Sequence, residues 1–251
     1  MVIKNNWWKT TFGREYFSLW NPSSLSSQTW TRKEIKLIID LRLKNGAKVL
    51  DIPCGQGRHS VELAKKGFQV TGVDYSSTAL QIAKKWARQN KVSPIFIKQD
   101  MRFLKLNERF DAIIMLGNSF GYFSDANNEK IIKNISAALE PKGFFIIHLL
   151  NPIKAIKQFG KKNVFKVSGG HVNIKDISFD PLNFVRESQW TIVRNNKKKI
   201  LNVKLRFYTF SEIRSLFSCY KLSIVNIYGS LDKKPYSSKS SAMIVIAKKT
   251  K

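Results

Sequence analysis

The sequence contains few of the residues that build metal centres and disulfide frameworks. Among its 251 residues there are two cysteines, Cys54 and Cys219, and three histidines. The cysteines lie far apart and form no C-x-x-C pair, so neither a disulfide framework nor a zinc site is indicated. We therefore expect no bound metal. Unpaired cysteines also favour a reducing compartment, which is typical of the cytoplasm.

Long hydrophobic segments are missing as well. The longest candidate, residues 144–150, is interrupted by His148 and is far shorter than the roughly 20 apolar residues that span a bilayer. The first residues, MVIKNNWWKTTF, show no charged region followed by an apolar one, so we expect no signal peptide. These absences argue against a membrane partner and favour a cytoplasmic location.

Acidic residues are scarce relative to basic ones. The chain carries 44 lysines and arginines against 17 acids, a formal net charge of +27. Residues 151–251 hold 21 of the basic and 5 of the acidic side chains. Such a surface could attract RNA or an acidic acceptor. However, the enrichment is in lysine rather than in arginine, which is the better bidentate phosphate ligand, so a compositional bias explains the charge at least as well.

What the sequence does contain is a strand–turn–helix–strand pattern over residues 48–74. A short apolar strand ends at Asp51, Gly55 and Gly57 allow a tight turn, and a second strand ends at Asp74. A third strand, residues 94–98, is followed by Asp100. Ligands bind outside the carboxyl ends of strands in open α/β sheets. We therefore expect the three acids to share one pocket; ordinary solvation of strand ends is the alternative.

The remaining pattern predicts how the chain is organised. Helices are expected at 30–43, with Thr31 as N-cap, at about 76–89, at about 127–139 and at 209–219. Further strands are expected at 110–116, 144–150, 222–228 and 242–247, and alternating runs over 164–207 predict an antiparallel meander. We expect a single domain, 1–251. It consists of an aromatic arm (1–30), a core (31–150), an inserted β meander (163–208) and a closing helix with two strands (209–251).

Five segments in this order resemble a class I S-adenosylmethionine-dependent methyltransferase. They are DIPCGQGRH at 51–59, VTGVDYS at 70–76, QDM at 99–101, FDAIIMLGNSFGYF at 110–123 and LEPKGFFII at 139–147. The resemblance covers residues 31–150 and, through the closing strands, most of the chain. It is strongest to small bacterial members with an inserted β meander. It implies a doubly wound, Rossmann-like α/β fold: a mostly parallel seven-stranded sheet with helices on both faces and a small antiparallel β insert.

The resemblance also implies the cofactor S-adenosyl-L-methionine, with S-adenosyl-L-homocysteine as product. Asp51 would anchor the glycine loop and meet the methionine amino group. Asp74 would accept both ribose hydroxyls, and Asp100 would accept the adenine amino group. The expected cofactor-binding residues are Asp51, Pro53, Cys54, Gly55, Gly57, Arg58, Asp74, Tyr75, Asp100, Met101, Leu116, Gly117 and Asn118. Pro53 stands where the family pattern has its first glycine, and it has no N–H to donate to a ligand.

For the acceptor side, we expect the arm and the meander to close over the pocket. Tyr122 and His148 are candidate catalytic residues, and the candidate acceptor-binding residues are Tyr16, Tyr122, Arg206 and Tyr208. The alternatives are a core role for His148, a local acid as partner of Arg206, and packing for Tyr16. Trp20 is a further candidate contact, whereas Trp7 and Trp8 are expected to pack.

The expected activity is in-line methyl transfer to a nitrogen or oxygen atom of a small molecule. An RNA methyltransferase is the first alternative, although the fourth strand is followed by GNSFGY rather than by the Asn/Asp-Pro-Pro-Tyr loop of many base-methylating enzymes. A non-enzymatic cofactor-binding regulator is the second. A nicotinamide dehydrogenase is disfavoured because Ser60 replaces the third glycine of that fingerprint. No oligomeric state is predicted.

Overall fold

The protein is built around a seven-stranded sheet with the strand order β10-β11-β5-β4-β1-β2-β3. The computed structural model describes residues 6–19, 22, 24–161, 163–167 and 170–250. Five strands pair in parallel, and β11 runs antiparallel to both of its neighbours, β5 and β10. The strands are β1 (Lys48–Asp51), β2 (Gln69–Asp74), β3 (Ile95–Lys98), β4 (Phe110–Met115), β5 (Leu139–Leu150), β10 (Leu222–Tyr228) and β11 (Ala242–Lys249).

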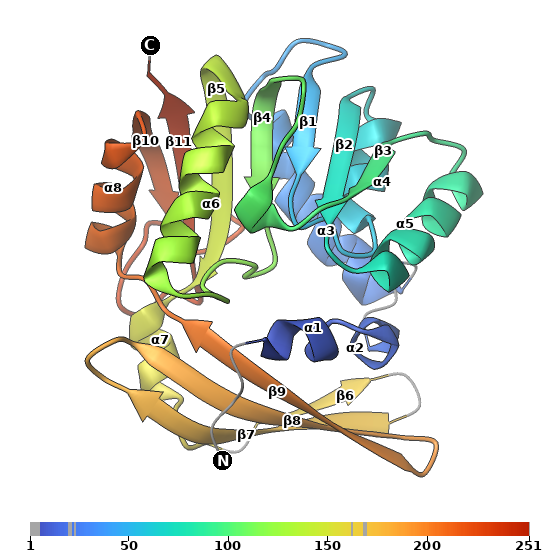
Figure 1. The fold of residues 1–251 in the computed structure, drawn as a ribbon, viewed down its shortest axis with the longest axis vertical. Helices are drawn as coiled ribbons and strands as arrows, with labels where there is room; N and C mark the ends of the chain where they lie inside the picture. Colours follow the sequence, from blue (N-terminus) through green and yellow to red (C-terminus); the bar gives the residue numbers. More distant parts are fainter. Residues whose placement is uncertain (1–5, 20–21, 23, 162, 168–169, 251) are drawn as a thin grey trace.

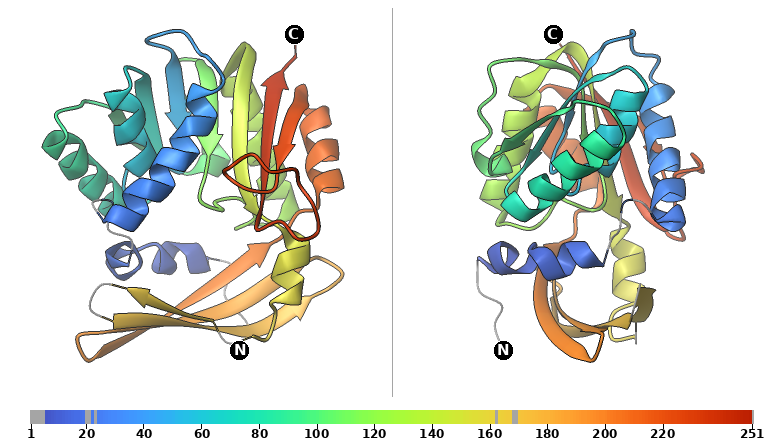
Figure 2. Two further views of the ribbon diagram at one scale, coloured as in Figure 1. Left: turned by 180° about the vertical axis from the view of Figure 1, so that it is seen from behind. Right: turned by 90° about the vertical axis from the view of Figure 1, so that its right-hand side faces the viewer.

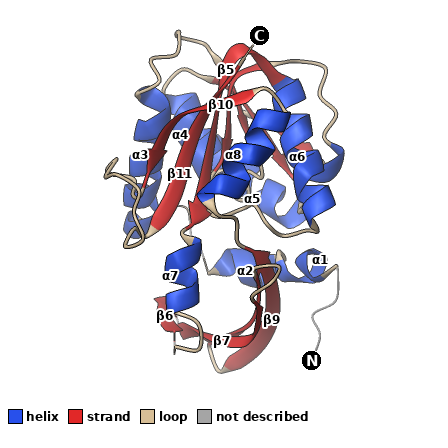
Figure 3. Ribbon diagram, turned by 90° about the vertical axis from the view of Figure 1, so that its left-hand side faces the viewer, coloured by secondary structure: helices blue, strands red, loops and turns tan. Residues whose placement is uncertain are grey.

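Helices cover both faces of this sheet. On one face lie α3 (Leu25–Ile39), α4 (Arg58–Lys65) and α5 (Ser77–Gln89), and on the other lie α6 (Asp125–Ala138) and α8 (Phe210–Cys219), as Figures 1 and 3 show. Successive strand residues point to opposite faces, so one strand supplies both cores. In β4, for example, Ile113 joins the α6–α8 side and Ile114 the α3–α4 side. The predicted doubly wound fold is confirmed.

Helix α3 differs from its sequence prediction, and short helices that were not predicted are also present. Helix α3 begins before Thr31: Ser24 is the N-cap and accepts from the backbone N–H of Ser27, so the predicted cap at Thr31 is wrong. Thr31 instead lies buried within the helix. A short helix that was not predicted, α7 (Pro152–Lys157), follows β5, with Asn151 as its N-cap. By contrast, Ser76 caps α5 as expected.

The predicted meander is present as a second, four-stranded antiparallel sheet in the order β6-β7-β8-β9. It lies beyond the carboxyl ends of the parallel strands (Figure 1), and helices α1 (Trp7–Thr11) and α2 (Arg14–Ser18) lie between it and the main sheet (Figure 2). Its strands are β6 (Asn163–Val167), β7 (Gly170–Asp180), β8 (Val185–Arg194) and β9 (Lys197–Arg206). Trp20 lies outside the described residues.

The arm is tied to both sheets, and thus encloses the space between them. The hydroxyl of Thr11 donates to the carbonyl of Asn202 on β9 at 2.7 Å. On the opposite side, the amide of Gln56, in the glycine loop, donates to the carbonyl of Phe17 at 2.6 Å. No helix of the described part of the chain has the length and apolarity needed to cross a membrane.

Candidate active site

Asp51 and Asp74 lie at the carboxyl ends of β1 and β2 and hold the glycine loop from below. The carboxylate of Asp74 accepts the backbone N–H groups of Gly55 and Ser76, both at 2.8 Å. Asp51 accepts the hydroxyl of Ser60 at 2.6 Å. Asp74 therefore fixes the turn, and Asp51 fixes the start of α4. The structure brings together these two strand-end acids as the sequence pattern suggested.

Burial changes the acidity of both groups. Asp74 is 8% exposed, and burial raises its pKa to about 6 against the lowering effect of the Ser76 and Gly55 N–H groups. Burial also raises the pKa of Asp51, although His59 and the Ser60 hydroxyl oppose it. A desolvated carboxylate gains from hydroxyl donors. Asp74 is therefore well suited to accept the two hydroxyl groups of a ribose.

The glycine loop combines an open position with a packed one. Gly55 has φ +53°, and a Cβ built on it would meet only the ring of Phe17, at 3.8 Å. Gly57 has φ +75°, but its Cβ would lie 2.8 Å from that of Ala83. Gly57 is thus required by the packing of α5, and Gly55 is where a ligand can approach the backbone. Pro53 precedes both, after a cis peptide bond.

The other loop residues are fixed from the sheet side. The N–H of Cys54 donates to the carbonyl of Val73 at 2.9 Å, and burial raises the pKa of the Cys54 thiol well above its usual value. The thiol is therefore an apolar packing group at working pH. Tyr75, which follows Asp74, packs edge-on against Trp8 of the arm with ring centroids 4.7 Å apart.

Asp100 is held by an arginine that the sequence analysis did not single out. Arg102 donates to it through its backbone N–H at 2.9 Å and through Nη2 at 2.6 Å. Burial acts to raise the pKa of Asp100, but these bonds outweigh it and the pKa is lowered. The Arg102 guanidinium also lies 4.8 Å from the ring centroid of Trp8 and 4.5 Å from that of Phe123. Met101 is buried beside it.

Arg58 and His148 meet at a buried acid, Glu34 of α3. The carboxylate, which is fully buried, pairs with Nη1 of Arg58, with Nε2 of His59 at 2.7 Å and with Nδ1 of His148 at 3.3 Å. His148 is thereby accounted for as a buried partner of Glu34. The sequence offered one usable signal for this acid: Glu34 is spaced three residues from Thr31 and four from Ile38, on the buried face of the helix.

Leu116, Gly117 and Asn118 follow β4 and complete the rim. Leu116 is buried, and the N–H of Asn118 donates to the carbonyl of His148 at 3.2 Å. Asn118 adopts a left-handed conformation (φ 59°), and its buried Oδ1 has no hydrogen-bond partner. An amide oxygen in this state can accept a hydrogen bond from a ligand. These features, the open Gly55 and the buried Asp74 fit a nucleoside ligand with an amino-acid end.

The two tyrosines expected on the acceptor side lie in one aromatic cluster with Phe12. Tyr122 packs against Phe12 at 5.2 Å between ring centroids, and Tyr16 packs edge-on against the same ring at 4.9 Å. Tyr16 also approaches Trp190 of β8 at 6.2 Å. Burial is the main cause that raises the pKa of Tyr122, and the nearby Tyr16 adds to the increase. The cluster therefore links arm, core and meander, and Tyr122 remains a neutral phenol.

Arg206 and Tyr208, in contrast, are engaged by local acids. The guanidinium of Arg206 pairs with Glu212 and, through Nε at 3.3 Å, with Asp125, while it stacks 4.4 Å from the ring centroid of Tyr208. The Tyr208 hydroxyl donates to Asp125 at 2.6 Å. Of the two partners considered for Arg206, the structure shows the local acid. Its role is to join β9 to the starts of α6 and α8.

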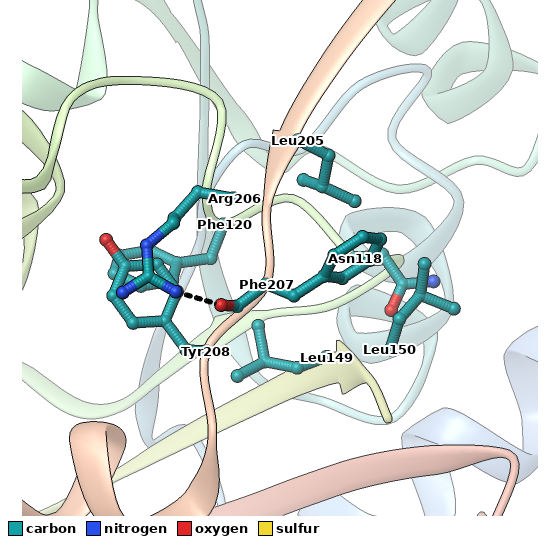
Figure 4. A pocket seen from close by; sticks show the side chains of 8 residues that line it. All are labelled: Asn118, Phe120, Leu149, Leu150, Leu205, Arg206, Phe207 and Tyr208. Carbon is teal, nitrogen blue, oxygen red and sulfur yellow. Dashed lines mark hydrogen bonds between the residues drawn. The ribbon is translucent and has the colours of Figure 1, made fainter. Parts of the chain in front are cut away.

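Beside this pair lies a small pocket between the core and the meander, with a cavity volume of about 10 Å³. This is roughly the room of one water molecule. Figure 4 shows Asn118 and Leu150 on one side of it and Arg206 and Tyr208 on the other. The remaining lining residues are Phe120, Leu149, Leu205 and Phe207. Five of its eight lining residues are apolar, and Asn118 contributes a polar amide from the β4 loop.

Comparison with known proteins places this site in a family. Residues 49–143 match the family described as a methyltransferase domain. Over 121 residues the chain is 34% identical to glycine N-methyltransferase of Rattus norvegicus. This alignment covers 43% of this chain and 41% of the relative. It is 33% identical over 141 residues to ubiquinone biosynthesis O-methyltransferase of Coxiella burnetii (strain Dugway 5J108-111), covering 53% and 56%. The chain thus spans about half the length of these relatives.

The likeness in fold extends further than the likeness in sequence. An S-adenosylmethionine-dependent methyltransferase from Clostridium acetobutylicum ATCC 824 superposes with a TM-score of 0.79 at 20% identity, covering 88% of this chain and 91% of that one. The shared fold therefore extends well beyond the matched segment 49–143. The matched segment 49–143 contains the glycine loop, Asp74, Asp100 and the β4 loop. The chain thus carries a methyltransferase domain over residues 49–143 and shares its fold with an S-adenosylmethionine-dependent methyltransferase.

Proposed function

We propose that the protein transfers the methyl group of S-adenosylmethionine, by in-line displacement, to a nitrogen or oxygen atom of a small-molecule acceptor. The observation that carries the proposal is the open backbone at Gly55 beside the buried carboxylate of Asp74. This arrangement suits a nucleoside whose ribose must be held by two hydroxyl groups. The two named relatives, an N- and an O-methyltransferase of small molecules, support the acceptor class.

On the cofactor side, each residue has a role that its surroundings support. The sulfonium of the cofactor supplies an activated methyl group. Asp74 holds the ribose, Asp51 keeps the loop in place through Ser60, and residues 116–118 line the methionine end. Met101 packs against the adenine ring. Asp100 accepts the adenine amino group while it keeps its bonds to Arg102, because each carboxylate oxygen can accept more than one hydrogen bond.

On the acceptor side, positioning and exclusion of water supply much of the rate. The aromatic cluster of Phe12, Tyr16 and Tyr122 closes the space under the arm, and the second sheet forms a cap. Tyr122 acts as a neutral hydroxyl that orients the acceptor, since burial raises its pKa. A neutral amine needs no dedicated base. His148 is held by Glu34 and supports the pocket wall.

One observation favours RNA as a second candidate acceptor. Lys197, Lys198 and Lys199 are exposed at the tip of the β8–β9 hairpin. In the register of the sheet they stand opposite Arg194, Val193 and Ile192. A cluster of lysines without an acid among its cross-strand partners attracts phosphates. The small-molecule acceptors in the names of the two relatives favour a metabolite instead, and we place it first.

Calorimetric titration tests the cofactor. We expect the protein to bind S-adenosylmethionine and S-adenosylhomocysteine and to bind NAD no better than a control nucleotide. Asp74→Ala should lose at least about tenfold in affinity while the far-ultraviolet circular dichroism is unchanged, because two charge-assisted hydrogen bonds are removed. Binding of NAD without binding of S-adenosylmethionine would refute the proposal, and unchanged affinity of Asp74→Ala would place the ribose elsewhere.

Transfer of a radiolabelled methyl group tests the acceptor. The protein is incubated with labelled S-adenosylmethionine and either a metabolite extract or total RNA, and the label is followed in each fraction. We expect label in small molecules. Label in RNA alone would establish the second candidate, and tight cofactor binding without transfer to either fraction would indicate a regulator.

A further inference from the structure

A fully buried carboxylate, that of Glu34, lies behind the cofactor-lining loops. It comes from α3, outside the segment that carries the family motifs. Its Oε2 accepts from Nη1 of Arg58 and pairs with Nε2 of His59 at 2.7 Å, and its Oε1 faces Nδ1 of His148 at 3.3 Å. Three donors from two other elements, α4 and β5, thus converge on one side chain of α3.

Two of the three partners of Glu34, Arg58 and His148, lie beside the β4 loop at the pocket rim. Arg58 is the first residue of α4, directly after the glycine loop, and its Nη2 lies 3.7 Å from the place of a Cβ on Gly117. The carbonyl of His148 accepts the N–H of Asn118 at 3.2 Å. Glu34 therefore holds two residues that adjoin the β4 loop: Arg58, which lies beside Gly117, and His148, which bonds to Asn118.

The orientation of Arg58 is fixed on one side only. Its Nη1 donates to Glu34 and also to the hydroxyl of Thr31 at 2.9 Å. Thr31 and Glu34 are three residues apart on the buried face of α3, so they bind the same edge of the guanidinium. The Nη2 edge is directed toward the β4 loop at Gly117. A planar guanidinium held by one edge presents its other edge in a defined direction.

Glu34 remains ionised in this cluster. Burial acts to raise its pKa, but His59, His148 and Arg58 together hold the pKa well below its usual value. A buried ion pair is a weak source of stability, because desolvation offsets the attraction between the charges. A role in fixing the geometry of the site explains its presence better than a role in stability alone.

We propose that Glu34 is a positioning residue of the cofactor site: with Thr31 it holds the Nη1 edge of Arg58 so that the Nη2 edge faces the carboxylate of the cofactor's amino-acid end. This inference rests on the proposed function, since the ligand is S-adenosylmethionine or its product. It assigns to α3, which lies outside the family-matching segment, a direct influence on recognition of the methionine end. Glu34 itself contacts Arg58 and the histidines rather than the cofactor.

Two ligands that differ in the amino-acid end test the proposal by calorimetry. S-adenosylhomocysteine carries the carboxylate, and 5′-methylthioadenosine has the same nucleoside and sulfur without it. Glu34→Ala should lower the affinity for S-adenosylhomocysteine by about tenfold, which is the scale of one charge-assisted hydrogen bond. It should change the affinity for 5′-methylthioadenosine by less than about twofold. Glu34→Gln keeps the length of the side chain and an oxygen that can accept from Nη1, and it should recover most of the affinity.

The controls separate positioning from folding. Asp176 is a matched residue, because its side chain is 2% exposed and pairs with an arginine, Arg186, in the second sheet. Asp176→Ala should lower the melting temperature and leave the affinity ratio of the two ligands unchanged. If Glu34→Ala fails to fold, Thr31→Val removes the second acceptor of Nη1, together with the bond from the Thr31 hydroxyl to the Ser27 carbonyl within α3, and should show a selective loss of about threefold.

The possible outcomes are distinct. Equal losses for both ligands in Glu34→Ala would show a general effect on the fold and overturn the proposal, as would unchanged affinity for both. Equal losses in Glu34→Gln and Glu34→Ala would show that charge rather than positioning is decisive, and would also overturn it. Failure of the unmodified protein to bind S-adenosylhomocysteine would instead refute the proposed function.

Discussion

The carboxylate of Asp74 carries a prediction about pH. Burial raises its pKa to about 6, so the free protein takes up a proton at this residue as the pH falls through that value. The ribose hydroxyls donate hydrogen bonds, and the ionised carboxylate is the better acceptor. Binding therefore competes with the proton. We expect the affinity for S-adenosylhomocysteine, measured by calorimetry, to be constant above pH 7 and to fall by up to about tenfold per unit below pH 6.

Asp74→Asn is the control for this pH dependence. Asparagine has nearly the same shape but does not titrate, so the variant should bind weakly and with little dependence on pH between 5 and 8. A pH profile in Asp74→Asn like that of the unmodified protein would assign the titration to another group. Asp51, whose carboxylate is bonded to Ser60 inside the protein, should contribute little to the profile.

For single residues, the sequence predicted the positions of acids at strand ends better than it predicted contacts between distant elements. Asp51 and Asp74 could be placed because parallel strands end at one edge of the sheet, and the structure joins both to the glycine loop. Glu34 and Arg102 were not singled out, because their partners come from other elements or depend on the direction of a loop. Arg206 was singled out, but its acids Asp125 and Glu212 became neighbours only on folding, so the sequence did not rank the local acid above an acceptor.

Among the elements, the join between β9 and the β4 loop depends on a single glycine. Gly121 has φ +98°, and a Cβ there would lie 2.2 Å from the carbonyl oxygen of Arg206, whose N–H donates to the carbonyl of Gly121 at 2.9 Å. Gly121→Ala should therefore push the second sheet away from the core. We expect a loss of about 3 kcal/mol in the free energy of unfolding, measured in urea.

Gly160 provides the matched comparison. It also has a positive φ, +77°, but a Cβ there would meet no atom within 4 Å. Gly160→Ala should thus reveal the backbone strain alone, about 1 kcal/mol. If the two variants lost the same stability, the close contact with Arg206 would not be what makes Gly121 necessary.

The arm is the second element whose attachment can be tested. Trp8 is buried, packs against Tyr75 and lies over the Arg102 guanidinium. Trp8→Ala should reduce stability by about 3 kcal/mol, and it should increase amide hydrogen exchange within residues 7–18 more than in β4. Trp30 is 51% exposed, so Trp30→Ala should change stability by less than about 0.5 kcal/mol. Unchanged exchange in Trp8→Ala would show that the arm is held by other contacts.

Elements with a clear periodic spacing of apolar residues were predicted well, but their boundaries were predicted less accurately. The alternating pattern of the meander and the apolar run of β4 fixed the number and type of strands. The start of α3 was placed too late because Ser24 and Thr31 are both acceptable N-caps, and a local pattern does not rank them. Strand β5 begins at Leu139, earlier than predicted, and its pairing with β4 shifts register between Phe110 and Ala112. Such a bulge accommodates the Pro141–Gly143 turn signal.

Across the whole molecule, the two sheets have different roles in the proposed reaction. The carboxyl ends of the parallel strands supply the cofactor pocket, and the antiparallel sheet covers the same edge from the opposite side (Figure 1). The family segment 49–143 lies in the first part, whereas the covering sheet comes from the chain beyond it. Recognition of the cofactor could therefore be predicted from motifs. Recognition of the acceptor depends on side chains that two separately formed layers bring together.

The net charge of +27 gives a final prediction about the class of acceptor. The three lysines 197–199 lie at the hairpin tip of the covering sheet, and lysine contacts with phosphates make binding strongly dependent on salt. If the acceptor is a small molecule, Lys197→Glu/Lys198→Glu/Lys199→Glu should keep kcat/KM for methyl transfer within about twofold of the unmodified protein, because exposed charges at a distance are screened.

The comparison variant is Lys84→Glu/Lys85→Glu/Arg88→Glu, which makes the same change of charge on the exposed face of α5. For an RNA acceptor, only the hairpin variant would lose transfer. The activity of the unmodified protein would also fall by at least about tenfold between 50 and 200 mM salt. Equal and small effects of both variants, with weak dependence on salt, are expected, because a small-molecule acceptor does not depend on phosphate contacts with the lysine hairpin.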